Sequence, residues 1–225
     1  MNLTSKVAVV TGSSSGVGAA TARLLASKGC HVVINYSNSS DAAQKVALDC
    51  QHFGVETLVC QADVSDDDAC KSLAAKAIAK WGRIDILINN AGTTKFVPHQ
   101  QLDGLDKNDF FALYGVNVVG PYQMLRACEF ALRASGDAAV VNVSSIAGVR
   151  GIGSSIAYAA SKGALLTMTQ SLARVMGPEI RVNAVCPGFI QGEWLEQGIG
   201  TENYQKIKNS LEESAPLKKT CTAES

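Results

Sequence analysis

A tyrosine and a lysine four positions apart are the side chains of this sequence best placed to do chemistry. Tyr158 and Lys162 lie in the segment YAASK (158–162), where helical spacing would put them on one helix face. A free phenol has a pKa of about 10, too high for efficient proton transfer near neutral pH, and a neighbouring ammonium group favours the phenolate. The spacing therefore predicts that Lys162 lowers the pKa of Tyr158 and makes it usable as a general acid or base.

A serine at the end of a predicted strand could act on the same substrate atom. Ser145 follows the apolar run Ala138–Val143, and open parallel sheets bind their ligands at the carboxyl ends of the strands. Its hydroxyl could hydrogen-bond a carbonyl oxygen and the negative charge that develops there. A tyrosine and a lysine at helical spacing are common on amphipathic helices without catalytic meaning. Their combination with Ser145 and with a glycine-rich turn favours a catalytic site.

This glycine-rich turn, TGSSSGVG (11–18), follows the first predicted strand and leads directly into a helix. Gly12 would allow a tight exit from the strand, Gly16 would let backbone amides approach a pyrophosphate, and Gly18 would let the helix pack closely. The helix N-terminus would face the anion. Turns and helix ends also use glycine for structural reasons alone. The order of strand, glycines and helix nevertheless predicts a dinucleotide site.

Short runs rich in valine and isoleucine alternate with segments of helical spacing, and such continuous apolar runs are typical of parallel strands buried on both faces. We predict one α/β domain over residues 1–225: three layers, α/β/α, around a doubly wound parallel sheet (Rossmann fold) with helices on both faces. The predicted strands are Val7–Val10, His31–Ile34, Thr57–Cys60, Ile84–Ile88, Ala138–Val143 and Arg181–Val185. The predicted helices are Gly16–Lys28, Asp41–Phe53, Asp66–Trp81, Lys107–Leu132 with a break, and Ile156–Met176.

The stretch 189–213 departs from this rhythm and predicts a substrate lid. It contains glycines at 192, 198 and 200, then an amphipathic helix. Together with the segments 93–96 and 147–155 it would line the substrate site. The apolar side chains on offer are Phe96, Ile152, Trp194, Leu195 and Ile199, without clustered arginine or lysine. An apolar ketone or alcohol fits this lining better than a charged acid or a nucleotide.

The motifs TGxxxGxG, NNAG (89–92), a strand-end serine, YxxxK and a later PG (187–188) all occur here in that order. On them the chain resembles the short-chain dehydrogenases/reductases, from about Lys6 to its end. The resemblance implies Tyr158 as the general acid/base, Ser145 as the group that orients the carbonyl, and Lys162 as the residue that lowers the tyrosine pKa and holds the nicotinamide ribose. It also implies that Asn117 kinks a helix and holds a water in the proton relay.

The resemblance further implies a nicotinamide dinucleotide cofactor. Asp63 matches the acid that accepts a hydrogen bond from the adenine amine, although an aspartate there could equally be an N-cap or turn residue. Asn90 would fasten neighbouring strands and line the cofactor, and the segment 187–190 would place the carboxamide. Gly192 stands where family members often have threonine. The predicted cofactor contacts are Gly12, Ser14, Ser15, Gly16, Val17, Gly18, Asn35, Tyr36, Ser37, Asp63, Val64, Asn90, Ala91, Gly92, Tyr158, Lys162, Pro187, Gly188 and Ile190.

The end of the second strand bears on the choice of cofactor. An acid there would bind the ribose diol of NAD and repel a 2′-phosphate. This chain has the neutral residues Asn35, Tyr36 and Ser37, which resemble the NADPH-using branch of the family. Against this, family members that use NADP often carry a basic residue where this chain has Ser15. We predict NADP(H), with NAD as the alternative.

Composition limits the partners. The 20 lysines and arginines balance the 20 aspartates and glutamates, so no excess charge exists to hold a nucleic acid or an acidic membrane surface. The seven cysteines form no CxxC pair and no Cys/His ligand spacing, which predicts no metal site and reduced thiols in the cytoplasm. The start of the chain has no signal-peptide pattern, and no apolar run is long enough to cross a membrane.

The sequence thus predicts an oxidoreductase that moves a hydride between NADP(H) and a carbonyl or secondary alcohol. The alternatives are a 3-oxoacyl carrier-protein reductase, which would need a basic patch for the carrier, and a non-catalytic cofactor-sensing protein of the same fold. An epimerase or dehydratase would need a different lid. Family chains usually continue past the segment 215–219 into a helix and a seventh strand, so we expect the last strand of the sheet to be missing. We expect a homo-oligomer, a homotetramer in the intact gene product.

Overall fold

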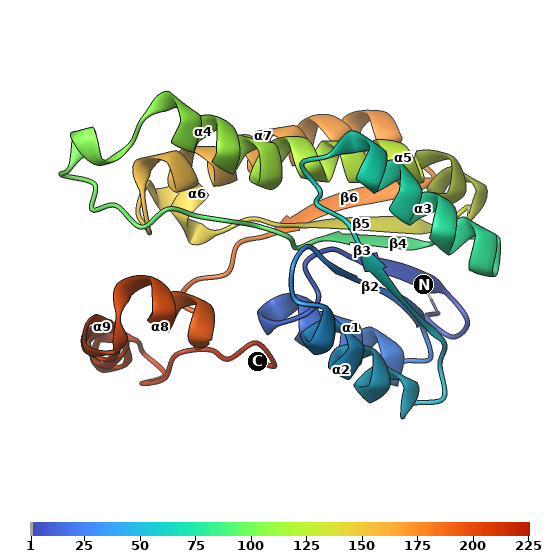
Figure 1. Ribbon diagram of the computed structural model, residues 1–225, viewed down its shortest axis with the longest axis horizontal. Coiled ribbons are helices and arrows are strands. Elements are labelled where there is room, and N and C mark those ends of the chain that lie inside the picture. The colour runs from blue at the N-terminus through green and yellow to red at the C-terminus, as the bar shows by residue number, and fades with distance from the viewer. Residues whose placement is uncertain (1) are drawn as a thin grey trace.

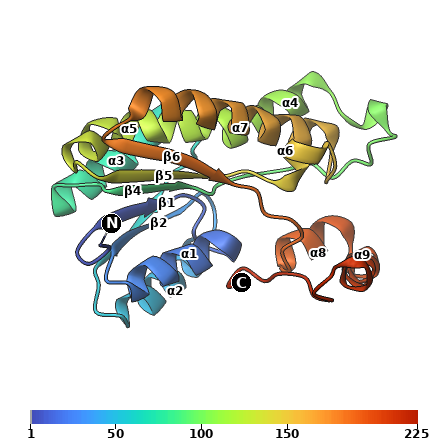
Figure 2. The ribbon, with the colours of Figure 1, turned by 180° about the vertical axis from the view of Figure 1, so that it is seen from behind.

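The computed structural model describes residues 2–225 and contains one α/β domain (Figures 1 and 2). Six parallel strands form one sheet in the order β3-β2-β1-β4-β5-β6. The strands are β1 (Val7–Val10), β2 (His31–Tyr36), β3 (Thr57–Gln61), β4 (Ile86–Asn89), β5 (Ala138–Val143) and β6 (Ile180–Val185). Because the winding reverses between β1 and β4, their carboxyl ends form the edge where such sheets bind ligands. The predicted doubly wound sheet is confirmed.

Helices cover the two faces of this sheet unequally. The helices α1 (Gly16–Ser27) and α2 (Ser40–Gln51) lie on one face, and α3 (Asp67–Trp81), α5 (Gly120–Ala134) and α7 (Ile156–Met176) lie on the other (Figure 1). Side chains alternate between the faces, so Ala8 and Val10 join the core under α1 and α2 while Val9 joins the opposite core. The three-layer arrangement is as predicted.

Burial on both faces was expected for every strand, and for β6 that expectation is wrong. Arg181, Asn183 and Val185 are exposed, whereas Ile180 and Val182 are buried. The layer of α1 and α2 does not extend over this edge strand, so only the face toward α7 is covered. The alternation of apolar and polar residues in IRVN is the signal for a half-exposed strand.

The predicted break between residues 107 and 132 is a π-helical turn. It spans Gly115–Val119 and joins α4 (Lys107–Tyr114) to α5. Gly120 follows the turn and packs against Val64, where a β-carbon would lie 2.7 Å from the valine side chain. Two short elements were not predicted, the 3₁₀ turn Leu102–Gly104 and α6 (Ile146–Arg150).

The predicted lid contains two helices, α8 (Glu193–Ile199) and α9 (Thr201–Ser214). They lie beyond the carboxyl edge of the sheet, apart from the two helical layers (Figures 1 and 2). Within residues 2–225, no helix is both long and apolar enough to traverse a lipid bilayer.

At the amino ends of the strands, opposite the carboxyl edge, Asp85 carries a fully buried carboxylate. Its oxygens accept hydrogen bonds from the Val7 amide at 2.9 Å, from Lys6 Nζ at 3.0 Å and from the Arg83 guanidinium at 2.6 and 2.8 Å. Burial pushes the pKa of Asp85 upward, but the bonds from Arg83, Val7 and Lys6 outweigh it and hold the pKa below its ordinary value. This ionised group fastens the start of β1 to β4.

Replacing Asp85 with asparagine should therefore lower the free energy of unfolding by about 2 kcal/mol at pH 7, because two cations lose their partner. Since the folded pKa is depressed, the stabilisation is complete above the ordinary pKa of about 4 and is lost as the pH falls below it. Urea unfolding of wild type and Asp85→Asn at pH 7 and pH 3 measures both effects.

The matched control is Asp137→Asn. Asp137 lies 3.7 Å from Arg181, and both side chains are more than half exposed. We expect this variant to change stability by less than about 0.5 kcal/mol. Equal losses in the two variants would contradict the importance of the buried carboxylate.

Candidate active site

The structure brings Ser145, Tyr158 and Lys162 together at the carboxyl end of β5. Ser145 is the N-cap of α6, where its Oγ accepts a hydrogen bond from the Ala147 amide at 3.1 Å. Tyr158 lies in the first turn of α7 and Lys162 one turn later. The Ser145 hydroxyl lies near enough to the Tyr158 phenol to lower its pKa, so the two helices bring their candidate catalytic side chains together.

The pKa of Tyr158 differs from the sequence-based expectation. Burial raises it above the ordinary value, and the nearby Ser145 hydroxyl lowers it by less. Lys162 Nζ lies 5.8 Å from the centre of the tyrosine ring and donates to the Val143 carbonyl at 2.8 Å, and its lowering of the tyrosine pKa stays a prediction. The phenol is therefore held in its protonated form at neutral pH.

Lys162 itself is only 4% exposed, and burial lowers its pKa to about 8. At pH 7 the ammonium form still predominates, since the pKa lies above this pH. The amine would lose its proton within the mildly alkaline range, which an exposed lysine does not.

Asn117 lies in the π-helical turn and is fully buried. Its Oδ1 accepts from the Thr93 amide at 2.8 Å, and its Nδ2 donates to the Thr93 carbonyl at 2.9 Å and to Ser161 Oγ at 3.0 Å. Ser161 in turn donates to the Tyr158 carbonyl at 2.8 Å. The Asn117 side chain thus ties the segment after β4 to the helix of the candidate catalytic residues. Its part in holding a water stays a prediction.

The glycine-rich turn has the shape that a dinucleotide needs. Gly12 has φ +59°, and a β-carbon there would lie 2.8 Å from the Ala91 backbone. A β-carbon on Gly18 would lie 2.5 Å from the Gly12 carbonyl oxygen, whereas Gly16 has φ +53° and open space beside it. The first turn of α1 has no side-chain cap and no acidic residue, so its amides are free of protein anions. These features fit the pyrophosphate of a dinucleotide.

The turns after β1 and β4 are fastened to each other. Asn90 Nδ2 donates to the carbonyls of Thr11 and Gly12 at 2.9 and 3.0 Å. Thr11 Oγ1 accepts from the amides of Asn90 and Ala91, each at 3.0 Å. The strand fastening predicted for Asn90 is present, and its contact with a cofactor stays a prediction. The sequence-based analysis missed Thr11, whose signal was its place directly before Gly12.

Asn35 has a different place from the one expected of a ribose ligand. It is buried, its Oδ1 accepts from the Gly12 amide at 3.0 Å, and its Nδ2 donates to the carbonyls of Cys60 and Ala62 at 3.3 and 3.0 Å. These bonds occupy the side chain inside the protein, so Asn35 shapes the glycine-rich turn. The groups that remain at the end of the second strand are Tyr36 and Ser37.

Asp63 forms a tight turn with Ser65, whose amide and hydroxyl donate to its Oδ1 at 2.9 and 2.7 Å. The N-cap of α3 is Asp66. The turn role considered for Asp63 is present, and its contact with an adenine stays a prediction. A second residue that the sequence-based analysis missed is Ser155, the N-cap of α7, which accepts from the Tyr158 amide at 3.2 Å. Its signal was a serine directly before the helical segment.

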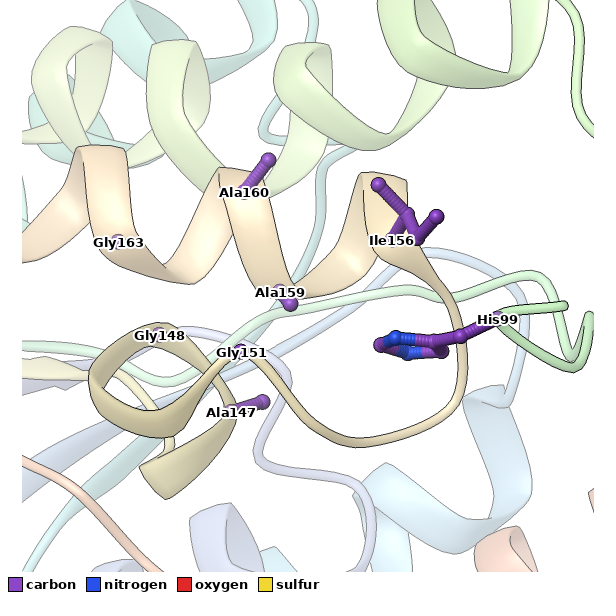
Figure 3. Close-up of a pocket in the computed structure, with 8 residues that line it drawn as sticks. All are labelled: His99, Ala147, Gly148, Gly151, Ile156, Ala159, Ala160 and Gly163. Carbon is purple, nitrogen blue, oxygen red and sulfur yellow. The ribbon is translucent and has the colours of Figure 1, made fainter. Parts of the chain in front are cut away.

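A pocket of about 340 Å³ lies between α6, α7 and the segment after β4 (Figure 3). Ile156, Ala159 and Gly163 line it from a face of α7 different from the one that carries Tyr158 and Lys162. The ring of His99 extends between the start of α7 and the α6–α7 loop, and its Nε2 is buried without a partner among the described residues. In residues 2–225, no three histidine, cysteine, aspartate or glutamate side chains gather as metal ligands.

A parallel sheet with this glycine-rich turn, and with a partly buried serine and tyrosine beside a buried lysine at its carboxyl edge, is the arrangement of a dinucleotide-binding oxidoreductase. A sequence profile of the short chain dehydrogenases matches residues 6–202. A protein of Streptomyces violaceoruber, named as a ketoacyl reductase of the granaticin polyketide synthase, is 39% identical over 214 residues, 95% of this chain and 83% of that protein. The chain belongs to the short-chain dehydrogenase/reductase family.

Solved structures agree with this membership. A crystal structure described as a short-chain dehydrogenase/reductase from Burkholderia xenovorans is 44% identical and has a TM-score of 0.90, with coverage of 98% of this chain and 87% of its own. NAD⁺-bound xylitol dehydrogenase is 27% identical, with a TM-score of 0.91 and coverage of 100% and 90%. The protein is thus an oxidoreductase of a family that uses NAD(P) and acts on small molecules, which favours an enzyme over a non-catalytic cofactor-sensing protein.

The buried amine of Lys162 yields a stability prediction. Because its pKa is lowered in the folded state, keeping it charged at pH 7 opposes folding, and Lys162→Met should raise the free energy of unfolding by about 1–2 kcal/mol. The folded protein releases this proton near pH 8 and an unfolded chain releases it near 10.5, so wild type should regain stability over that range. Urea unfolding at pH 7 and pH 10 measures the difference.

The control for this prediction is Lys71→Met. Lys71 is exposed and pairs with Asp67 and Asp68. Loss of its charge should lower stability slightly, with the opposite sign to Lys162→Met. A destabilised Lys162→Met at pH 7 would show that the bond to the Val143 carbonyl outweighs the burial of the charge.

Proposed function

We propose that this enzyme transfers a hydride between NADP(H) and the carbonyl carbon of a small apolar ketone, or the reverse from the secondary alcohol. The observation that carries the proposal is the neighbouring pair Ser145 and Tyr158, with buried Lys162 one helical turn after the tyrosine. When bound, the nicotinamide supplies or accepts the hydride.

Each of the three side chains has a distinct part in the proposal. The Tyr158 hydroxyl gives its proton to the carbonyl oxygen during reduction, and its raised pKa ensures that the proton is present at neutral pH. Ser145 donates a hydrogen bond to the same oxygen and stabilises the charge that develops on it. The Lys162 ammonium, fixed by the Val143 carbonyl, provides a positive charge near the phenol and a donor toward the ribose. Asn117 holds a water that returns protons to this group.

The predicted homo-oligomer also stays a prediction. Phe111 on α4 and Phe130 on α5 are 69% and 86% exposed, and apolar surface of this kind favours self-association.

Replacing Tyr158 with phenylalanine should lower kcat by about a thousandfold, because the proton donor is lost while the ring is kept. Binding of NADPH, measured by fluorescence titration, should change by less than about twofold. Tyr122→Phe is the control, since this phenol lies half exposed on α5. Retention of more than a tenth of the turnover in Tyr158→Phe would remove the phenol from the proposed role.

The cofactor proposal rests on the end of β2. No carboxylate follows this strand, and Asn35 points inward, which leaves the hydroxyls of Tyr36 and Ser37 for a 2′-phosphate. Michaelis constants for NADPH and NADH in one reductase assay test it. We expect a constant for NADPH about tenfold below that for NADH, since hydrogen bonds to a phosphate are worth about 1.5 kcal/mol or more. A lower constant for NADH would overturn the choice.

A second candidate is reduction of a 3-oxoacyl group on a carrier protein, favoured by the similarity to the granaticin ketoacyl reductase. Lys95, on the segment after β4, is paired with Asp109 at 2.8 Å, so its charge is partly offset as a contact for an acidic carrier. A comparison of free ketones with acetoacetyl carrier protein in the same assay separates the two candidates. Faster turnover of the carrier-bound substrate would favour the second.

A further inference from the structure

The lid is internally connected but thinly attached to the rest of the domain. The helices α8 and α9 pack mainly on each other, and α8 has no buried residue. The tail after α9 returns to the start of the lid, where the Gln191 amide donates to the Cys221 carbonyl at 2.8 Å and Gln191 Nε2 donates to Thr220 Oγ1 at 2.9 Å. The lid and this tail therefore form one unit.

Phe96 is one place where the body of the domain contacts this unit. Its ring lies 5.7 Å from the ring of Trp194, with an angle of 55° between the planes. It also fills the space beside Gly198, where a β-carbon would overlap the phenylalanine ring. Even so, Trp194 is 54% exposed. The aromatic contact is thus a small interface between two separately held parts.

The segment that carries Phe96 passes directly over the candidate active site. Gly92 faces Lys162 Nζ and Thr93 is bonded to Asn117. Thr94 Oγ1 then lies 2.6 Å from Ser154 Oγ, and the Val97 amide donates to the Ser154 carbonyl at 2.8 Å. These bonds flank Phe96 on both sides.

The α6–α7 loop, which contains Ser154, also contacts the ring of Tyr158. A β-carbon on Gly153, the residue before Ser154, would lie 3.7 Å from the Tyr158 ring. Phe96 therefore projects toward the lid from a backbone that is fixed to the neighbours of Tyr158.

We propose that Phe96 is a specificity-determining residue, whose ring latches the lid through Trp194 and Gly198 and restricts the access of wide ketones to the site of Tyr158. The inference rests on the proposed carbonyl reduction at Tyr158. Gly198 allows the latch to close, because only glycine leaves room for the Phe96 ring at this position. A wider polycyclic ketone would have to displace this ring and open the latch.

Substrate selectivity tests whether the Phe96 ring restricts the size of the substrate. The ratio of kcat/KM for α-tetralone to that for cyclohexanone should rise about tenfold in Phe96→Ala, since loss of the ring admits the second substrate ring. Phe96→Leu, which keeps most of the volume, should change the ratio by less than about threefold. An unchanged ratio in Phe96→Ala, with cyclohexanone still turned over, would show that the Phe96 ring does not restrict the size of the substrate.

Backbone hydrogen exchange over residues 193–199 tests the latch without any turnover. Gly198→Ala forces the ring away, so exchange in this segment should be at least about tenfold faster than in wild type. Gly192→Ala is the matched control in the same lid, because its backbone is extended and no atom lies within 4 Å of the added carbon. Equal exchange in Gly198→Ala and wild type would overturn the latch. Absence of any ketone turnover by wild type would instead refute the proposed function, and the exchange measurement would still decide the latch.

Discussion

The mutual fastening of the turns after β1 and β4 is the constraint on which the site depends. Asn90 and Thr11 exchange hydrogen bonds between two strands that are far apart in sequence but adjacent in the sheet. Their bonds hold Gly12 so close to Ala91 that only glycine fits. The glycine-rich turn and the segment that leads past Lys162 and Asn117 are thereby placed relative to each other. Burial of these polar groups without partners would cost several kcal/mol, so the arrangement is strongly selected in the folded state.

Burial, rather than the mutual attraction of charges, determines the state of the candidate catalytic groups. It raises the pKa of Tyr158 and lowers that of Lys162, so both shifts favour the neutral forms. A lysine ammonium lowers the pKa of a phenol more strongly the closer it lies to the phenol oxygen. Here the Val143 carbonyl holds the ammonium, which leaves the phenol protonated and suited to proton donation.

Much of this arrangement could be predicted from local sequence. Strand runs, the glycines with positive φ and the spacing of Tyr158 and Lys162 are local signals, and the sheet and the meeting of Ser145 with Tyr158 follow from them. The inward orientation of Asn35 could not be predicted, because it depends on an amide of Gly12 and carbonyls after β3 that only the fold brings near. The pKa values of Tyr158 and Lys162 likewise depend on burial. The exposed face of β6 was predictable from the alternation of apolar and polar residues in IRVN (180–183).

The uneven distribution of burial also explains where motion can occur. The body of the domain is fixed by two apolar cores and by the ionised Asp85 inside the opposite edge of the sheet. The predicted lid, residues 189–213, buries little apart from Tyr204, which packs against Phe189 with ring centres 5.4 Å apart. Segments with few buried apolar contacts open at a small fraction of the global unfolding free energy. A site closed by such a segment can admit and release substrate while the residues that would bind cofactor and move protons stay fixed in the rigid body.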